Sequence, residues 1–269
     1  MAWSGDNPCS LIGTGLVREG RVAISLGTSD TIFGLMREPR VDPTATGHVF
    51  GAPTGDFMSL TVFKNGSLAR ERIRDAFGLD WSGFSRALEQ TPAGNGGRVL
   101  LPWFEPEITP AVATAGEHRF RLDPSDAAGN VRAVVEAQML SMALHSRWMD
   151  VKVDTIYATG GASANRAILQ VMADVFGADV YQMEVGNSAA LGAALRAFHA
   201  DSLADGRALP WDEVIDGFVT PVEESRVMPN AARHQLYREL IEIYASCEAR
   251  ALGSAIDPTA ALEAFARRV

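Results

Sequence analysis

The stretch that decides the fold reads Thr155-Ile156-Tyr157-Ala158-Thr159-Gly160-Gly161-Ala162-Ser163-Ala164-Asn165. Its first four residues are apolar or β-branched, which predicts a strand. The two glycines predict a tight turn. The residues from Asn165 to Phe176 then carry apolar side chains at helical spacing, namely Ile168, Leu169, Met172 and Val175. The stretch therefore predicts a strand that meets a glycine-rich turn at the N-terminus of a helix, a unit typical of α/β proteins.

Segments on either side continue this alternation of strands and helices. Runs rich in apolar and β-branched residues predict strands at 21–26, 31–36, 57–63, 99–101 and 179–183. Apolar residues at helical spacing predict helices at 68–74, 81–88, 131–148, 211–215, 232–252 and 259–269, of which 131–148 is the first long amphipathic one. Residues 102–130 hold four prolines and little periodicity, which predicts an elaborated surface segment.

Residues 1–269 are interpreted as one α/β domain because no long hydrophilic linker interrupts the alternation. Within it, residues from about 205 to 269 predict a C-terminal helical cover. The helix that begins near Asn187 is rich in small residues, which permit a close approach to a neighbouring element. At the other end, residues 4–8 form a loop-like cluster, so residues 1–10 are expected to be a loop and the chain to begin inside a larger protein.

The composition excludes several classes of protein. With 47% apolar and 21% charged residues, the chain is an ordinary globular protein. Its 24 basic and 33 acidic residues leave a net charge of −9, which argues against nucleic-acid and membrane-surface partners. No apolar run is long enough for a membrane span, and no secretory signal is visible.

Cysteine and histidine usage predicts neither a metal site nor disulfides. Cys9 and Cys247 lie far apart, and the five histidines show no metal-ligand spacing. A reducing cytoplasm is therefore the expected compartment, and no residue is assigned as a metal ligand.

Several residues could carry chemistry, but each also has an ordinary structural interpretation. The turns at Gly27-Thr28-Ser29 and at Gly160-Gly161 could present N–H groups to phosphate oxygens, or could simply connect elements. No dinucleotide-binding or P-loop motif is present. Asp6 could act as a general base, or could cap a turn or helix. Trp81 could stack on a nucleotide base or belong to the core.

An ordered set of motifs decides between these interpretations. The set comprises Gly5-Asp6-Asn7-Pro8, Ser25-Leu26-Gly27-Thr28-Ser29-Asp30-Thr31, Phe63-Lys64-Asn65-Gly66-Ser67, Ala158-Thr159-Gly160-Gly161-Ala162-Ser163-Ala164-Asn165, Ala173-Asp174-Val175-Phe176 and Asn187-Ser188-Ala189-Ala190-Leu191-Gly192. In this order they resemble the C-terminal domain of FGGY carbohydrate kinases. The resemblance covers nearly the whole chain, from Ser4 to the helix near Leu252.

The resemblance implies an actin-like, ribonuclease-H-like α/β domain, with a mixed sheet flanked by helices, that forms the second half of a two-domain sugar kinase. It implies ATP with Mg²⁺ as phosphate donor and a pentulose, D-xylulose foremost, as acceptor. Related acceptors such as ribulose or glycerol stay open. The first domain of the family is absent from this sequence. The chain is therefore expected to be inactive alone, to need that domain as a partner, or to self-associate as a homodimer.

The resemblance also assigns roles to matching residues. It implies that Asp6 is the catalytic base and that Asp6 and Asn7 contact the sugar. ATP contacts are implied for Gly27, Thr28, Trp81, Gly160, Gly161 and Asn165, with Trp81 matched on less distinctive surroundings. A different class of function, a non-catalytic nucleotide-binding or interaction module, remains an alternative because the first domain is missing.

Overall fold

The computed structural model describes residues 4–183 and 186–269. Its main sheet has seven strands in the order β3-β4-β2-β1-β7-β8-β9. Strand β1 (Arg21–Leu26) runs parallel to β7 (Thr155–Thr159), and β7 runs parallel to β8 (Asp179–Gln182). The remaining strands pair antiparallel with their neighbours: β2 (Asp30–Met36), β3 (His48–Gly51), β4 (Phe57–Phe63) and β9 (Val222–Val227). The sheet is mixed, as predicted.

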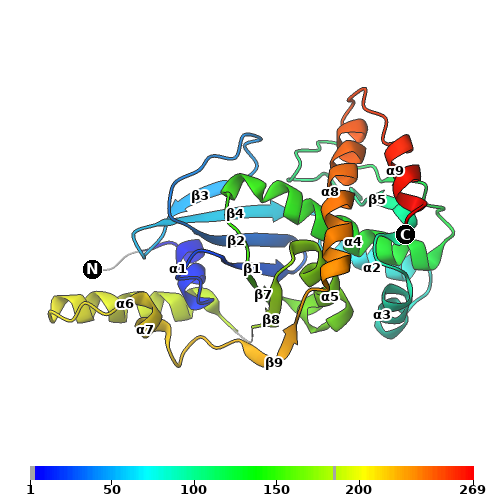
Figure 1. Cartoon of the computed structure of the whole chain (residues 1–269). Helices are drawn as coiled ribbons and strands as arrows, with labels where there is room; N and C mark the ends of the chain where they lie inside the picture. The colour runs from blue at the N-terminus through cyan, green and yellow to red at the C-terminus, as the bar shows by residue number, and fades with distance from the viewer. Residues whose placement is uncertain (1–3, 184–185) are drawn as a thin grey trace.

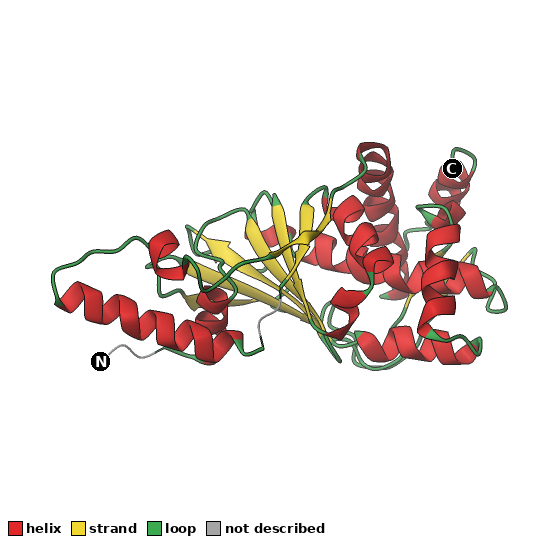
Figure 2. Ribbon diagram, turned by 90° about the horizontal axis from the view of Figure 1, so that it is seen from below, coloured by secondary structure: helices red, strands yellow, loops and turns green. Residues whose placement is uncertain are grey.

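Helices cover the two faces of this sheet in unequal layers (Figures 1 and 2). One face carries α1 (Asp6–Gly13), α6 (Ser188–Ala204) and α7 (Trp211–Ile215). The other carries α2 (Ser67–Ala76), α3 (Trp81–Gln90), α4 (Ala127–His145), α5 (Arg166–Phe176), α8 (Ala231–Ala251) and α9 (Thr259–Ala266). Side chains of β1 alternate between the layers: Val22 and Ile24 join the larger core, and Ala23 joins the smaller one.

Helix α4 is the centre of the larger layer and differs from its prediction. It begins at Ala127 and is capped by Asp126, whose carboxylate accepts a hydrogen bond from the Gly129 N–H at 2.9 Å. All residues from Gly129 to Met142 are buried, because α2, α3, α5 and α8 surround the helix. The predicted amphipathic pattern is therefore wrong, since a helix with partners on every side has no solvent face.

Parts of the chain that lack a clear pattern also depart from the predictions. The edge strands β3 and β9 were not predicted; both are largely exposed, so neither shows the alternation that marks a half-buried strand. Residues 102–130 are more than a surface segment. Their strand β6 (His118–Phe120) pairs with β5 (Val99–Leu101), and the side chain of Trp103 is only 3% exposed.

The C-terminal part of the chain divides between the layers. Helices α8 and α9 pack on the larger layer, where α8 contacts α4 and α5. Helix α7 instead contacts α6, and β9 extends the sheet beside β8. Among the residues that the structure describes, no helix is long and apolar enough to cross a membrane.

The segment expected to be a loop at residues 1–10 contains the start of α1. Gly5 is the N-cap and Asp6 the first helical residue, so Asp6 is neither in a loop nor a cap. Pro8 does not prevent the helix, because the N–H groups of the first turn have no intrahelical acceptor. A carboxylate in the first turn also interacts favourably with the helix dipole.

Helices α1 and α6 pack unusually close together. A Cβ atom placed on Gly192 would lie 1.8 Å from the carbonyl oxygen of Cys9, and one on Gly13 would lie 1.9 Å from that of Ser188. These contacts also show that the helices run antiparallel. The small residues of α6 therefore permit a backbone-to-backbone approach, as expected from the sequence. Cys9 lies in this crossing, and both it and Cys247 are buried and free.

This crossing predicts a large effect of one methyl group. Gly192→Ala should lower the free energy of unfolding by about 3 kcal/mol, because the methyl group can be accommodated only if the two helices move apart. Gly116→Ala is the matched control, since a Cβ there meets no atom within 4 Å. Urea denaturation of both variants measures the difference, and equal losses would contradict the close crossing.

Candidate functional site

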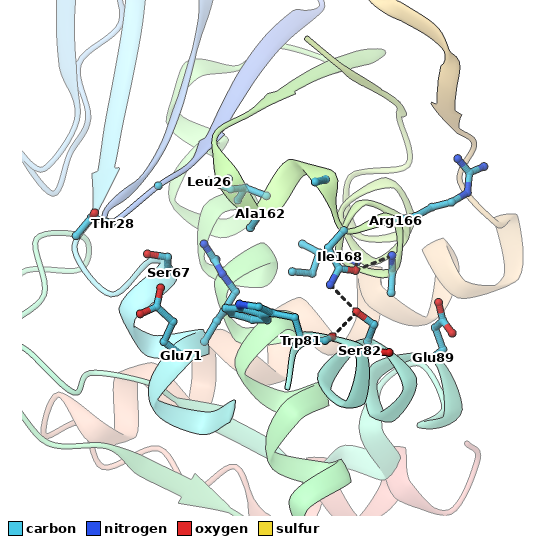
Figure 3. A pocket seen from close by; sticks show the side chains of 17 residues that line it. Leu26, Thr28, Ser67, Glu71, Trp81, Ser82, Glu89, Ala162, Arg166 and Ile168 are labelled. Carbon is cyan, nitrogen blue, oxygen red and sulfur yellow. Dashed lines mark hydrogen bonds between the residues drawn. The ribbon is translucent and has the colours of Figure 1, made fainter. Parts of the chain in front are cut away.

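A pocket of about 800 Å³ opens beside the carboxyl ends of β1 and β7 (Figure 3). Its wall consists of the turn after β1, the first turns of α2, one side of α3, and the segment from Gly161 to Ile168. Five residues assigned from the resemblance line it: Gly27, Thr28, Trp81, Gly161 and Asn165. Segments far apart in the sequence thus meet in one cavity.

The two glycines after β7 are required or tolerated for different structural reasons. Gly160 has φ +83°, and a Cβ there would lie 2.5 Å from the carbonyl oxygen of Leu26. Only glycine fits this position without displacing the end of β1. Gly161 is exposed, and a Cβ there would meet no atom within 4 Å. Gly160 therefore allows the turn to pack against the end of β1, and Gly161 leaves the side of the turn that faces the pocket free of side-chain atoms.

Asn165 begins α5 and faces the pocket. Its Oδ1 atom accepts hydrogen bonds from the N–H groups of Ala167 at 3.0 Å and Ile168 at 3.3 Å, so the side chain is the N-cap of the helix. Its amide nitrogen donates to the hydroxyl of Ser85 at 2.8 Å. This side chain thus connects α5 with α3.

Trp81 is the first residue of α3 and lies across the pocket from the turn after β7 (Figure 3). Its side chain is 42% exposed, so it does not belong to the core. One ring edge packs against Phe84, with centroids 5.4 Å apart, and the guanidinium of Arg74 lies 4.5 Å from the ring centre. The indole is held in place while part of its surface remains free for a planar ligand.

A buried ion pair supports the turn after β1, and sequence reasoning missed it. Arg70 of α2 donates from Nη1 to Oδ2 of Asp30 at 2.8 Å and from Nη2 to Oδ1 at 3.1 Å. Both side chains are almost fully buried. Burial raises the pKa of the Asp30 carboxyl, and the guanidinium of Arg70 opposes that rise. Arg70 also donates to Oε1 of Gln138 at 2.7 Å.

The hydrogen bonds of this ion pair extend through Gln138 to the segment that packs on the turn after β1. The amide nitrogen of Gln138 donates to the carbonyl oxygens of Asn65 and Gly66 at 2.8 and 2.9 Å. The Ser67 N–H donates to the Gly27 carbonyl at 2.8 Å, and a Cβ on Gly66 would lie 2.7 Å from the carbonyl oxygens of Gly27 and Thr28. The start of α2 therefore packs directly on the turn after β1.

Asn65 lies directly before α2, but its side chain does not cap the helix. The N-cap is Gly66, without a side-chain hydrogen bond. Asn65 instead donates to the carboxylate of Glu107 at 2.8 Å, and the N–H groups of Asn65 and Lys64 donate to the same carboxylate. Glu107 comes from the aperiodic segment 102–130, where no local pattern marks it.

Asp6 and Asn7 do not line the pocket. They begin α1, on the sheet face opposite to α2, α3 and α5 (Figure 1). The Asn7 N–H donates to Oδ1 of Asp6 at 2.8 Å, and the carboxylate is exposed. Within residues 4–183 and 186–269, no group of three or more His, Cys, Asp or Glu side chains could hold a metal ion.

Comparison with known proteins gives consistent matches. The profile of the C-terminal domain of the FGGY family of carbohydrate kinases matches residues 22–200. A rat protein, xylulose kinase, is 41% identical over 96% of this chain and 48% of its own length. Xylulose kinase 2 of Arabidopsis thaliana is 42% identical over 74% of this chain and 39% of its own length. The chain thus spans about half the length of the curated relatives it matches.

Solved structures match in fold. A ligand-bound xylulose kinase from Lactobacillus acidophilus superposes with a TM-score of 0.78 at 22% identity, covering 92% of this chain and 50% of that one. A glycerol kinase from Plasmodium falciparum, solved with ADP, gives 0.68 at 14% identity, covering 91% of this chain and 50% of that one. These neighbours support the actin-like fold expected from the sequence.

The buried pair beneath the pocket predicts a strong effect on stability. Arg70→Met should lower the free energy of unfolding by about 3–5 kcal/mol, because it leaves the Asp30 carboxyl buried without its partner. Arg18→Met is the control, since Arg18 and Asp154 form an ion pair whose side chains are 43% and 50% exposed, and its loss should cost less than about 1 kcal/mol. Adding Asp30→Asn to Arg70→Met should recover part of the loss. Urea denaturation tests all three, and similar losses for Arg70→Met and Arg18→Met would contradict the account.

Proposed function

This chain belongs to the FGGY family of carbohydrate kinases, whose C-terminal domain it matches over residues 22–200, and we propose that it is the nucleotide-binding half of a kinase that phosphorylates a pentulose. The observation that carries the proposal is the pocket in which the turn at Gly27, the turn at Gly161 and Trp81 meet. Because the chain spans about half the length of its relatives, the proposal concerns the activity of a two-domain protein that also contains the first domain of the family.

In the proposed complex, the phosphates of ATP lie at one end of this pocket and the adenine base lies at the other end. Thr28 and Ser67 offer hydroxyls and Gly27 offers backbone beside the end of β1, which suits phosphate oxygens. Trp81 and the turn at Gly161 lie at the other end, where an adenosine group can lie between the indole and the exposed backbone. We assign the nucleotide contacts to Gly27, Thr28, Trp81, Gly161 and Asn165, with Gly160 shaping the turn.

Phosphoryl transfer then requires a sugar hydroxyl aligned with the γ-phosphate. We assign Asp6 as the general base and Asn7 as its neighbouring sugar contact. Oδ1 of Asp6 accepts from the Asn7 N–H, and the second oxygen is available for the hydroxyl proton. As the sugar oxygen bonds to phosphorus, the bond from phosphorus to the β–γ bridging oxygen breaks. ADP leaves, and the proton resides on the carboxylate.

Magnesium is proposed to enter with the nucleotide. Bound to the phosphates of ATP, it would neutralise their charge during transfer. The described residues contain no group of three or more His, Cys, Asp or Glu side chains that could hold a metal ion. No metal ligand is therefore assigned to this chain.

D-xylulose is the proposed acceptor, with D-xylulose 5-phosphate as product. This choice is supported by the curated relatives from rat, mouse and Arabidopsis thaliana, which carry the name xylulose kinase at 40–42% identity. The acceptor assignment can be checked by ranking D-xylulose, ribulose and glycerol in a two-domain protein. A higher kcat/KM for ribulose or glycerol would overturn it.

A first test measures nucleotide binding by the chain itself. Calorimetric titration with Mg-ADP should show binding, and Gly161→Arg should weaken it at least about ten-fold, because the added side chain fills the pocket. Gly116→Arg is the control, since both glycines lie where an added Cβ meets no atom within 4 Å. A folded parent chain that binds no Mg-ADP would contradict the proposed nucleotide site.

A second test separates the base from the nucleotide site. In a protein that joins this chain to the first half of rat xylulose kinase, Asp6→Asn should lower kcat by about 10²- to 10⁴-fold, because no carboxylate remains to accept the hydroxyl proton. Its affinity for Mg-ADP should stay unchanged, since Asp6 does not line the pocket. Normal turnover of this variant would show that another group is the base.

A further inference from the structure

The two walls at the nucleoside end of the pocket are joined by one hydrogen-bonded pair of side chains, in addition to the packing of α3 on α5. Helix α3 supplies Trp81, Ser82 and Ser85, and the opposite wall begins at Gly161. In the part of the chain that the structure describes, the bond from the amide of Asn165 to the hydroxyl of Ser85 is the only hydrogen bond between α3 and residues 160–176.

The hydroxyl of Ser85 is both a hydrogen-bond donor and a hydrogen-bond acceptor. It accepts from Asn165 at 2.8 Å and donates to the carbonyl oxygen of Trp81 at 2.8 Å. Since Asn165 also caps α5, a continuous chain of hydrogen bonds runs from the first N–H groups of α5, through Asn165 and Ser85, to the backbone of Trp81. These bonds connect the backbone of Trp81 to the N-cap of α5.

We propose that Ser85 is a positioning residue, which sets the width of the nucleoside end of the pocket by fixing the helix of Trp81 to the N-cap of α5. The proposal rests on the proposed function, since it deepens the nucleotide site. Ser85 acts through Asn165 and Trp81, so its effect concerns the nucleoside part of the ligand. A pocket already set at the correct width loses less conformational freedom on binding, which increases affinity.

Ser82 provides a matched control. It lies on the same helix and lines the same pocket, but its hydroxyl accepts from Arg86 at 2.7 Å and has no bond to the opposite wall. Ser85→Ala and Ser82→Ala therefore remove the same atom from neighbouring positions. Only Ser85→Ala removes the hydrogen bond between the walls.

The test combines calorimetry with amide hydrogen exchange on the full chain. Ser85→Ala should bind Mg-ADP about five-fold more weakly than the parent chain, and Ser82→Ala less than two-fold more weakly, as expected for one lost hydrogen bond. Affinity for Mg-pyrophosphate, which has no nucleoside, should be the same in all three proteins. Amides in the first turn of α3 should exchange faster in Ser85→Ala than in Ser82→Ala.

A second variant tests whether Ser85 affects ADP affinity through Asn165. Asn165→Ser keeps an N-cap oxygen but is too short to reach Ser85, so adding Ser85→Ala to it should cause no further loss of ADP affinity. Equal effects of Ser85→Ala and Ser82→Ala, weaker pyrophosphate binding in Ser85→Ala, or unchanged exchange in α3 would each overturn the positioning role. Failure of the parent chain to bind Mg-ADP would overturn the proposed function, and the exchange data would then decide separately whether Ser85 fixes α3.

Discussion

The buried pair between Arg70 and Asp30 is the interaction on which the pocket depends. Asp30 begins β2 and Arg70 lies on α2, so the pair attaches the first helix of the larger layer to the turn that follows β1. Two charges are tolerated there because both oxygens of the carboxylate are bonded and Gln138 accepts a further N–H of the guanidinium. Through Gln138 the same network reaches α4 and the backbone at Asn65. The turn at Gly27 is thus fixed by groups from two distant parts of the chain, residues 65–70 and Gln138.

This arrangement gives the two ends of the pocket different rigidity. The proposed phosphate end lies on a buried network of charged and amide groups, in which the loss of a member leaves a further buried polar atom without a partner. The nucleoside end depends on the half-exposed helix α3 and on one neutral hydrogen bond between its walls. A rigid phosphate end suits a reaction that depends on positioning and electrostatics. At the nucleoside end, this one bond and the packing of α3 on α5 set the separation of the walls.

The sequence predicts those parts of the fold whose signals are local. Strands β1, β2, β4, β7 and β8 were predicted because apolar and β-branched runs end at turn residues, and the turn at Gly160 because adjacent glycines follow a strand. Edge strands such as β9 carry no such pattern, because their pairing depends on the neighbouring strand. The full burial of α4 was missed because periodicity reports one buried face and cannot show that other helices cover the opposite side. Glu107 and Arg70 could not be predicted as partners of Asn65 and Asp30, since 40 or more residues separate each pair in the chain. Only the resemblance to a family, and no local pattern, assigned roles to Asp6 and Trp81.

The layered fold also separates the proposed base from the proposed nucleotide site. Asp6 begins α1 on one face of the sheet, and the pocket walls α2, α3 and α5 belong to the other face. Their relative position therefore depends on the sheet and on how tightly α1 packs on its own layer. The close crossing of α1 and α6, in which neither Gly13 nor Gly192 leaves room for a methyl group, restricts that packing. A proton acceptor must lie within hydrogen-bond reach of the reacting hydroxyl, so under the proposed function a shift of about 1 Å in α1 is expected to lower turnover and to leave nucleotide affinity unchanged. The two glycines of the crossing thus help to position the helix that carries the proposed base, Asp6.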